Sequence, residues 1–212
     1  MERIPRTATV AITVVTALAW LLATLLGQPA KVAYLMGFVP ARFSGLPVLP
    51  PGTMAVPAFL TPLSATLVHS GLVHLGFNLL VFLWCGAQVE RVLGRTGLIT
   101  LYLVGAYASA LLQWAASPIS IVPMVGASGA ISAVIGAFAL SFGRSRAFTN
   151  NLRVNRWINV AWLMVAWIVL QVMMGWLAGG QGYLLATPAH IGGFAAGLLL
   201  QRPLLLFHYR RA

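Results

Sequence analysis

The chain has 212 residues, of which 60% are hydrophobic and only 7% are charged. A soluble domain carries about 25% charged residues, so this composition excludes an ordinary soluble protein and indicates an integral membrane protein. The net charge of +11 does not indicate nucleic-acid binding, because no soluble basic domain is present and arginines commonly gather in the cytoplasmic loops of membrane proteins.

Six apolar segments predict an all-α fold, a single domain over residues 1–212 with six membrane-spanning helices. They cover approximately residues 8–26, 66–89, 96–116, 126–142, 157–177 and 188–207. A span needs roughly 20 apolar residues, and it must be helical because lipid offers no hydrogen bonds to the backbone. The first segment is longer than the apolar part of a signal peptide, so we expect it to be retained as a span.

Residues 27–65 form the longest connection between predicted spans. This segment is rich in proline and glycine but still apolar, as in "LPVLPPGTMAVP" (residues 46–57). We therefore expect it to lie in the membrane interface or against the helices, and not to be a free linker.

Basic residues alternate between the two ends of the predicted spans. One side holds only Lys31 and Arg42, whereas the other side holds Arg3, Arg6, Arg91, Arg95, Arg144, Arg146, Arg153, Arg156, Arg202, Arg210 and Arg211. Because arginine and lysine concentrate in cytoplasmic loops, this pattern predicts that both termini are cytoplasmic. The second, fourth and sixth spans then all begin on the non-cytoplasmic side.

Unusual polar residues lie at these three beginnings. His69, His74 and Asn78 belong to the second predicted span, Ser128 to the fourth and His190 to the sixth. All five are therefore expected in the same half of the membrane. Ionisable residues within a membrane are costly and are commonly functional.

Small residues near Ser128 and His190 predict that the fourth and sixth spans pack closely. Ser128, Ser132 and Gly136 recur every four residues, and Gly129 and Ala133 widen the same stripe.

On the sixth span His190, Gly193 and Gly197 share one helix face, and the two glycines form a GxxxG pattern. Docking of the two faces would bring Ser128 toward His190. Packing alone also explains the small residues, so this alternative stays open.

A neutral imidazole near Ser128 could accept its hydroxyl proton and so create a nucleophile. A carboxylate usually orients such a base, but the only acidic residues are Glu2 and Glu90, which are predicted far from His190. A serine hydrolase of this composition would depend on a Ser-His dyad. The absence of aspartate also excludes an aspartyl intramembrane protease.

His74 and Asn78 are four residues apart, so a helix presents them on one face, where they could stabilise an oxyanion. A polar contact between helices is an equal alternative for this pair. His69 is expected on the same helix, turned away from the face of His74, as a supporting hydrogen-bond donor or an interfacial residue. A transport pathway, or a metal site of His69, His74 and His190, is a further alternative.

Three motifs together resemble the rhomboid family of intramembrane serine proteases: "HSGLVHLGFN" (69–78), "GASG" (126–129) and "AHIGGFAAG" (189–197). The resemblance implies that Ser128 is the nucleophile and His190 its base. It further implies that His74 and Asn78 line the oxyanion hole, with His69, Gly126, Gly129, Gly193 and Gly197 in support.

The resemblance also implies the substrates and the setting. We expect cleavage of transmembrane segments near the non-cytoplasmic face, no cofactor, no metal and no obligate protein partner. The expected location is the lipid bilayer of a bacterial inner (plasma) membrane, as a multi-pass protein. A catalytically inactive rhomboid-like protein that binds transmembrane clients is the alternative.

Two positions depart from the family pattern. Many bacterial members have an aromatic residue one turn after the nucleophile, against the histidine, where this chain has Ser132. The first loop has Arg42 and Phe43 but not the Trp-Arg pair of many members. Four tryptophans are expected to serve in the aromatic belt or in packing: Trp157, Trp162, Trp167 and Trp176.

Overall fold

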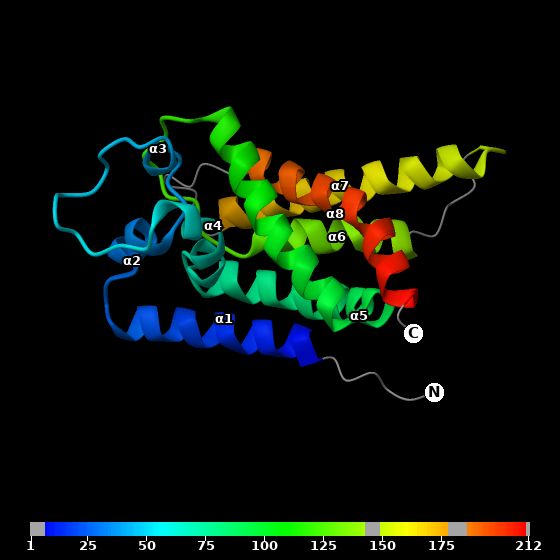
Figure 1. Ribbon diagram of the computed structural model, residues 1–212, viewed down its shortest axis with the longest axis horizontal. Coiled ribbons are helices and arrows are strands. Elements are labelled where there is room, and N and C mark those ends of the chain that lie inside the picture. The colour runs from blue at the N-terminus through cyan, green and yellow to red at the C-terminus, as the bar shows by residue number, and fades with distance from the viewer. Residues whose placement is uncertain (1–6, 143–148, 178–185, 211–212) are drawn as a thin grey trace.

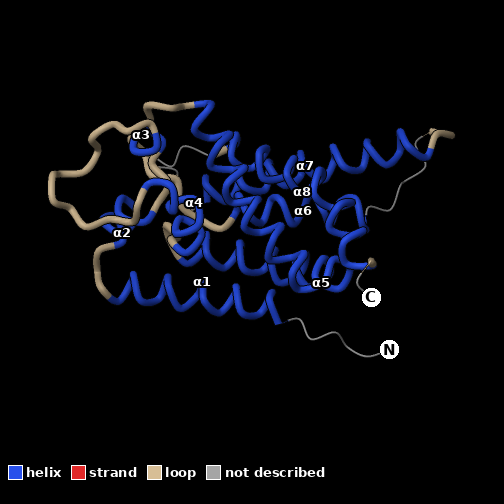
Figure 2. The backbone as a smooth tube through the Cα atoms, in the orientation of Figure 1, coloured by secondary structure: helices blue, strands red, loops and turns tan. Residues whose placement is uncertain are grey.

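The computed structural model of the chain describes residues 7–142, 149–177 and 186–210. Several features used in the sequence analysis lie outside these ranges, namely Glu2, Arg3, Arg6, Arg144, Arg146, Arg211 and the connection around Gly180. The described part is helical and contains no strand; one isolated antiparallel bridge joins Phe38 and Met124 (Figure 2). The predicted all-α class is therefore confirmed for these residues.

Five longer helices form the bundle, and five short helical segments lie between the first two of them. The longer helices are α1 (Thr7–Leu25), α5 (Leu72–Ala116), α6 (Ser128–Phe142), α7 (Leu152–Leu177) and α8 (Thr187–Tyr209). The short ones are α2 (Pro29–Met36), α3 (Pro40–Phe43), η1 (Ala58–Leu60), α4 (Thr61–Ser64) and η2 (Ala65–Leu67). Segment 27–65, predicted as a loop, therefore contains four complete short helices and the first residue of a fifth.

Four of the described helices are long and apolar enough to cross a membrane: α1, α5, α7 and α8. Helix α6 is apolar but has only 15 residues. The predicted number of six spans and the cytoplasmic position of both termini remain predictions.

Helix α5 unites the predicted second and third spans. Its only residue with non-helical backbone angles is Gly94, at φ 71° and ψ 171°. A side chain strongly disfavours this conformation, and glycine tolerates it. The two parts of α5 run in different directions on either side of Gly94 (Figure 1).

The beginning of α5 differs from the predicted beginning of the second span. The helix begins at Leu72, because residues 65–67 form a 3₁₀ turn and residues 68–71 are not helical. His69 thus precedes the helix that carries His74. The prediction that His69 lies on this helix was wrong.

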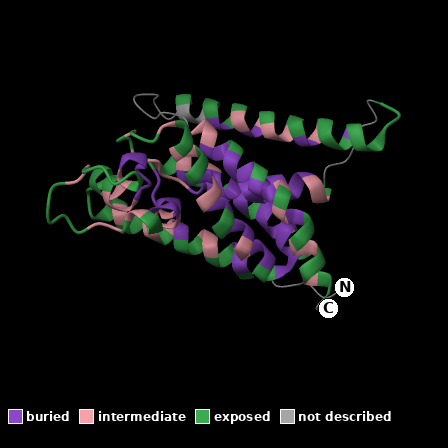
Figure 3. Cartoon of the chain, turned by 45° about the horizontal axis from the view of Figure 1, so that its top comes forward, coloured by how far each residue is buried: buried purple, intermediate pink, exposed green. Residues whose placement is uncertain are grey.

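Helix α6 occupies the centre of the bundle, between α5 and α8. Its residues from Ser128 to Ala139 are all buried. A helix that is apolar all round is expected in such a central position. Figure 3 shows the buried residues gathered inside the bundle, with exposed residues on the outward helix faces.

The segment between α1 and α5 is attached to the loop that precedes α6. The backbones of Phe38 and Met124 exchange two hydrogen bonds (3.0 and 2.8 Å), and the Ala41 N–H donates to the Ser120 carbonyl (3.0 Å). Phe43 packs edge-on against Trp114, with ring centroids 5.7 Å apart. The Arg42 guanidinium donates to the carbonyls of Tyr34 and Val56. This segment therefore supports the loop before Ser128.

Glu90 is almost fully buried and caps the beginning of α1. Its carboxylate accepts hydrogen bonds from the N–H groups of Ala8 (2.9 Å) and Thr9 (3.0 Å) and from the Thr9 hydroxyl (2.5 Å). The first N–H groups of a helix have no acceptor within the helix, and a negative charge there is favourable. Glu90 thus joins α1 to the part of α5 next to Gly94.

Replacing Glu90 by alanine is expected to lower the free energy of unfolding by about 2–4 kcal/mol, because it leaves buried donors without an acceptor. Glu90→Gln keeps one carbonyl oxygen and should lose about half as much. The measurement is unfolding in mixed detergent–SDS micelles. Gln88→Ala, on the same helix and only partly buried, is the matched control. Equal stability of Glu90→Ala and the control would contradict the capping role.

Candidate active site

Ser128 and His190 meet inside the bundle. The Ser128 Oγ and the His190 Nε2 are 2.9 Å apart, which is hydrogen-bond distance, although the residues are 62 positions apart in the chain. Both side chains are buried, 8% and 5% exposed. Ser128 is the first residue of α6, and His190 lies in the first turn of α8. The contact therefore depends on how these two helices pack.

Glycines form the contact between α6 and α8. A Cβ atom at Gly197 would collide with the Ala133 carbonyl oxygen and lie 2.8 Å from the carbonyl carbon. A Cβ atom at Gly193 would collide with the Gly129 carbonyl oxygen. At Gly129, a Cβ atom would lie 2.7 Å from the Ser109 side chain on α5. Three helices thus approach at distances that only glycine permits, next to the dyad.

Gly126 shapes the chain just before Ser128. Its φ angle is +111°, and a Cβ atom there would lie 2.7 Å from His74 Cε1 and 3.7 Å from Asn78 Nδ2. A side chain at this position would be strained by its backbone conformation and would also strike the His74 ring. Its N–H donates to the Ala65 carbonyl (2.9 Å). Glycine therefore lets this loop lie directly against the first turns of α5.

His74 and Asn78 both face this loop from α5. The His74 Nδ1 lies 3.0 Å from the Ser70 hydroxyl. Asn78 is fully buried, and neither atom of its side-chain amide has a hydrogen-bond partner among the described residues. A buried amide without partners is costly, which makes a role in binding a transient ligand worth testing.

His69 holds the loop before Ser128 by accepting a hydrogen bond. The Ala127 N–H donates to its Nε2 (3.3 Å), and its ring lies edge-on to that of His74, with centroids 5.1 Å apart. It accepts here from the backbone, a role that differs from the two that were expected, a hydrogen-bond donor and an interfacial residue. Because Nε2 accepts, the proton of a neutral His69 ring resides on Nδ1.

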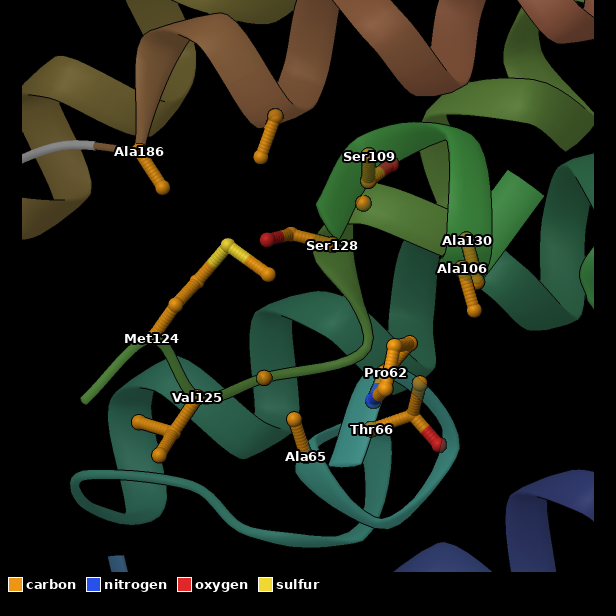
Figure 4. Close-up of a pocket in the computed structure, with 13 residues that line it drawn as sticks. Pro62, Ala65, Thr66, Ala106, Ser109, Met124, Val125, Ser128, Ala130 and Ala186 are labelled. Atoms are coloured by element: carbon orange, nitrogen blue, oxygen red, sulfur yellow. The ribbon is translucent and has the colours of Figure 1, made fainter. Parts of the chain in front are cut away.

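A small pocket lies beside the Ser128 hydroxyl. It has a volume of about 10 Å³, enough for about one water molecule. Ser109, Met124, Gly126 and Ala186 are among the residues that line it. In Figure 4 the Ser128 oxygen points into this space, with the Met124 side chain across from it. A water molecule or a substrate carbonyl can therefore lie next to the hydroxyl.

Trp167 is the residue at this site that the sequence analysis missed. It lies on α7 and is buried, and its Nε1–H donates to the Ser132 hydroxyl (2.7 Å). Its indole lies edge-on to the His190 ring, with centroids 6.3 Å apart. Of the two roles expected for this tryptophan, its burial fits packing and not the aromatic belt. Its distance from Ser128 along the chain left no sequence signal that could have indicated the contact.

In the part of the chain that the structure describes, the histidines form no metal-binding group with one another or with acidic or cysteine residues. Within residues 7–142, 149–177 and 186–210, no group of three His, Cys, Asp or Glu side chains is arranged to hold one metal ion. The alternative of a site made from His69, His74 and His190 thus gains no support from the described geometry.

Comparisons with known proteins identify the family. A Rhomboid domain family model matches residues 58–207. Rhomboid-type serine protease 2 of Emericella nidulans is 35% identical over 142 residues, which are 63% of this chain and 24% of that protein. RHOMBOID-like protein 4 of Arabidopsis thaliana is 33% identical over 147 residues, 68% of this chain and 34% of the relative.

A bacterial relative matches a similar length of this chain at a slightly lower identity. Rhomboid protease GlpG of Pectobacterium atrosepticum is 30% identical over 141 residues, 65% of this chain and 45% of that protein. The chain thus spans less than half of the length of these relatives. Since a fungus, a plant and a bacterium are represented, a bacterial inner membrane remains a prediction, whereas the apolar helices indicate a multi-pass membrane protein. The Rhomboid domain covers more than half of the chain, and the chain therefore belongs to the rhomboid family.

Proposed function

We propose that this protein is a serine-type endopeptidase that cleaves transmembrane segments near the non-cytoplasmic face of the membrane. The observation that carries the proposal is the 2.9 Å separation of the Ser128 Oγ and the His190 Nε2 inside an apolar bundle. The names of relatives support the same reaction, since they include a rhomboid-type serine protease and rhomboid proteases.

In the proposed reaction, the Ser128 Oγ attacks the scissile carbonyl carbon while the His190 Nε2 takes the hydroxyl proton. Collapse of the tetrahedral intermediate breaks the peptide C–N bond, and His190 gives its proton to the leaving amine. The acyl group stays on the Ser128 Oγ. His190 then takes a proton from a water molecule, which attacks the ester carbonyl carbon. As the ester C–O bond breaks, His190 returns a proton to the Ser128 Oγ and the new carboxyl end is released.

His190 works in this mechanism without a carboxylate. Glu90, the only described acidic residue, is occupied by the N–H groups of Ala8 and Thr9, in the part of α5 next to Gly94. His190 lies in the first turn of α8, whose other end carries His208; a Cβ atom at Gly94 would lie 2.7 Å from the His208 ring. Glu90, which is near Gly94, therefore lies at the end of the bundle opposite to His190.

The oxyanion of the intermediate is proposed to be bound by Asn78, His74 and the Ser128 N–H. The Ser128 N–H belongs to the first turn of α6, where backbone donors have no acceptor within the helix. The Asn78 amide is buried and unpaired among described residues, so it is available to an oxyanion without breaking an existing hydrogen bond. Preorganised donors of this kind stabilise the transition state more than the substrate.

The substrates are proposed to be transmembrane segments with helix-weakening residues. A regular helix occupies its carbonyls in its own hydrogen bonds, so the scissile carbonyl must first be released. The small pocket at Ser128 leaves no room for a helix beside the hydroxyl. An extended or unwound stretch of substrate therefore fits the site better.

Labelling with a fluorophosphonate tests the proposal. The folded protein in detergent micelles is expected to form a covalent adduct, which peptide mass spectrometry should locate at Ser128. Denatured protein, in which Ser128 and His190 are separated, is the control. Absence of labelling in folded protein, together with absence of cleavage of a model transmembrane substrate in liposomes, would favour an inactive protein that binds transmembrane clients.

Replacing Asn78 by alanine is expected to lower kcat by about 10²- to 10³-fold, the usual effect of removing one oxyanion donor. The free energy of unfolding should fall little, because the buried amide makes no hydrogen bond within the described part of the chain. Cleavage kinetics in liposomes and unfolding in micelles measure the two effects. A kcat within about threefold of the wild type would exclude Asn78 from the oxyanion site.

A further inference from the structure

The turn of α6 that follows Ser128 carries an unusually short side chain beside the dyad. Ser132 is fully buried, and its hydroxyl donates to the Ser128 carbonyl (2.7 Å). A serine is much smaller than an aromatic residue, so α6 by itself provides no ring beside His190 at this turn.

Trp167 of α7 reaches this place from another helix. It is only 4% exposed, and its indole N–H donates to the Ser132 hydroxyl (2.7 Å). The Ser132 oxygen therefore accepts one hydrogen bond from Trp167 and donates one to the Ser128 carbonyl. Both polar groups are satisfied by this chain of two hydrogen bonds, which links α7 to the backbone of the proposed nucleophile.

Two ring contacts hold the indole in one orientation. Phe77 of α5 is stacked on it, with centroids 6.0 Å apart and planes inclined by 19°. The His190 ring lies edge-on to it, with centroids 6.3 Å apart and planes inclined by 68°. Edge-to-face geometry is a favoured arrangement of aromatic rings. The indole is thus fixed independently of His190 and gives the imidazole a defined neighbour.

We propose that Trp167 is a positioning residue for His190, and that Ser132 is the partner which fixes the indole for this role. The inference rests on the proposed function, because it concerns the base of the dyad. An imidazole without a carboxylate has few groups to restrict its rotation. The Trp167 indole restricts it by contact on the α7 side.

Trp167→Ala is expected to lower kcat and the rate of fluorophosphonate labelling together by about 10- to 100-fold, since small misplacement of a catalytic group is costly. KM should change by less than about threefold, because the contact acts on the base and not on substrate binding. Trp167→Phe keeps a ring and should recover most of the rate. Trp162→Ala, an exposed tryptophan on the same helix, is the matched control.

A double-mutant cycle tests the partnership with Ser132. Trp167→Phe removes the indole donor, and Ser132→Ala removes the acceptor, so each is expected to lower the labelling rate by about three- to fivefold. The double variant should be no slower than either single variant, because all three lack the same hydrogen bond. If the reductions in labelling rate of the two single variants multiply in the double variant, the proposed role of Ser132 is wrong.

The NMR signal of the His190 ring gives a readout that does not depend on activity. The chain has four histidines, so in ¹³C-histidine-labelled protein the His190 signal can be assigned by its loss in His190→Ala. Trp167→Ala should shift this signal by removing the ring current of the indole, and Trp162→Ala should not. This difference between the wild type and Trp167→Ala is expected even if the wild-type protein neither labels nor cleaves. Failure of labelling and cleavage with the NMR difference present would refute the proposed function but not the position of the indole beside His190.

Two results would overturn the positioning role of Trp167. One is an unchanged labelling rate and an unchanged His190 signal in Trp167→Ala. The other is a loss of folded protein in Trp167→Ala combined with normal labelling and an unshifted His190 signal in Trp167→Phe and in Ser132→Ala. In the second case Trp167 would serve only the packing of α7.

Discussion

Replacing Ser128 by alanine is expected to reduce cleavage of a transmembrane substrate to the background of the assay, a loss of at least about 10³-fold. Without the Oγ no acyl-enzyme forms, and the remaining groups can only bind and polarise the substrate. His190→Ala should cause a loss of similar size, because the hydroxyl of serine is a poor nucleophile until a base removes its proton. The measurement is the cleavage rate of a model substrate reconstituted with the protein in liposomes.

The double variant Ser128→Ala/His190→Ala separates one catalytic unit from two independent contributions. Residues that act as a unit lose their whole effect with the first substitution, so the double variant should be no worse than either single variant. Ser141→Ala, a serine near the other end of α6, is the matched control and should cleave normally. Retention of more than about a tenth of the wild-type rate in Ser128→Ala would refute the proposed function.

Gly197→Ala is expected to lower the cleavage rate by about 100-fold or more, although it touches neither member of the dyad. The added methyl group would meet the backbone of Ala133, which cannot rotate away as a side chain can. Helix α8 must then move away from α6 and carry His190 with it. The same strain should lower the free energy of unfolding by about 1–3 kcal/mol, the usual cost of overpacking.

Gly76→Ala is the control for this prediction. Gly76 is also helical, but a Cβ atom there meets nothing within 4 Å, so alanine should be tolerated or slightly stabilising. Fluorophosphonate labelling and unfolding in micelles distinguish the two variants. If Gly197→Ala labels as fast as Gly76→Ala, close packing of α6 on α8 is not what brings Ser128 to His190.

The segment that precedes α5 illustrates the limit of sequence patterns. The residue spacing predicted one helix from Thr66, with His69 turned away from the face of His74. The helix begins only at Leu72, and His69 instead accepts a hydrogen bond from the Ala127 N–H. An apolar segment indicates burial, but it does not state where the backbone begins to satisfy its own hydrogen bonds.

The residues of α6 and α8 show which part of the site the sequence patterns could predict. Ser128, Gly129 and Ala133 form a stripe of small residues, and so do Gly193 and Gly197. Small residues permit close approach of two helices, so the stripes indicated the helix pair and its contact faces. The separation of 2.9 Å between Ser128 and His190 is a property of the folded bundle.

The sequence by itself determined a helical membrane protein and membership of the rhomboid family. Because it holds only two acidic residues, both predicted far from His190, it also indicated that a serine hydrolase of this sequence would depend on a serine and a histidine. Only the tertiary structure assigned Glu90 to the start of α1 and Trp167 to Ser132 and His190. Composition and periodicity describe one segment at a time. These contacts join residues from 23 to 82 positions apart, which only the packing of helices brings together.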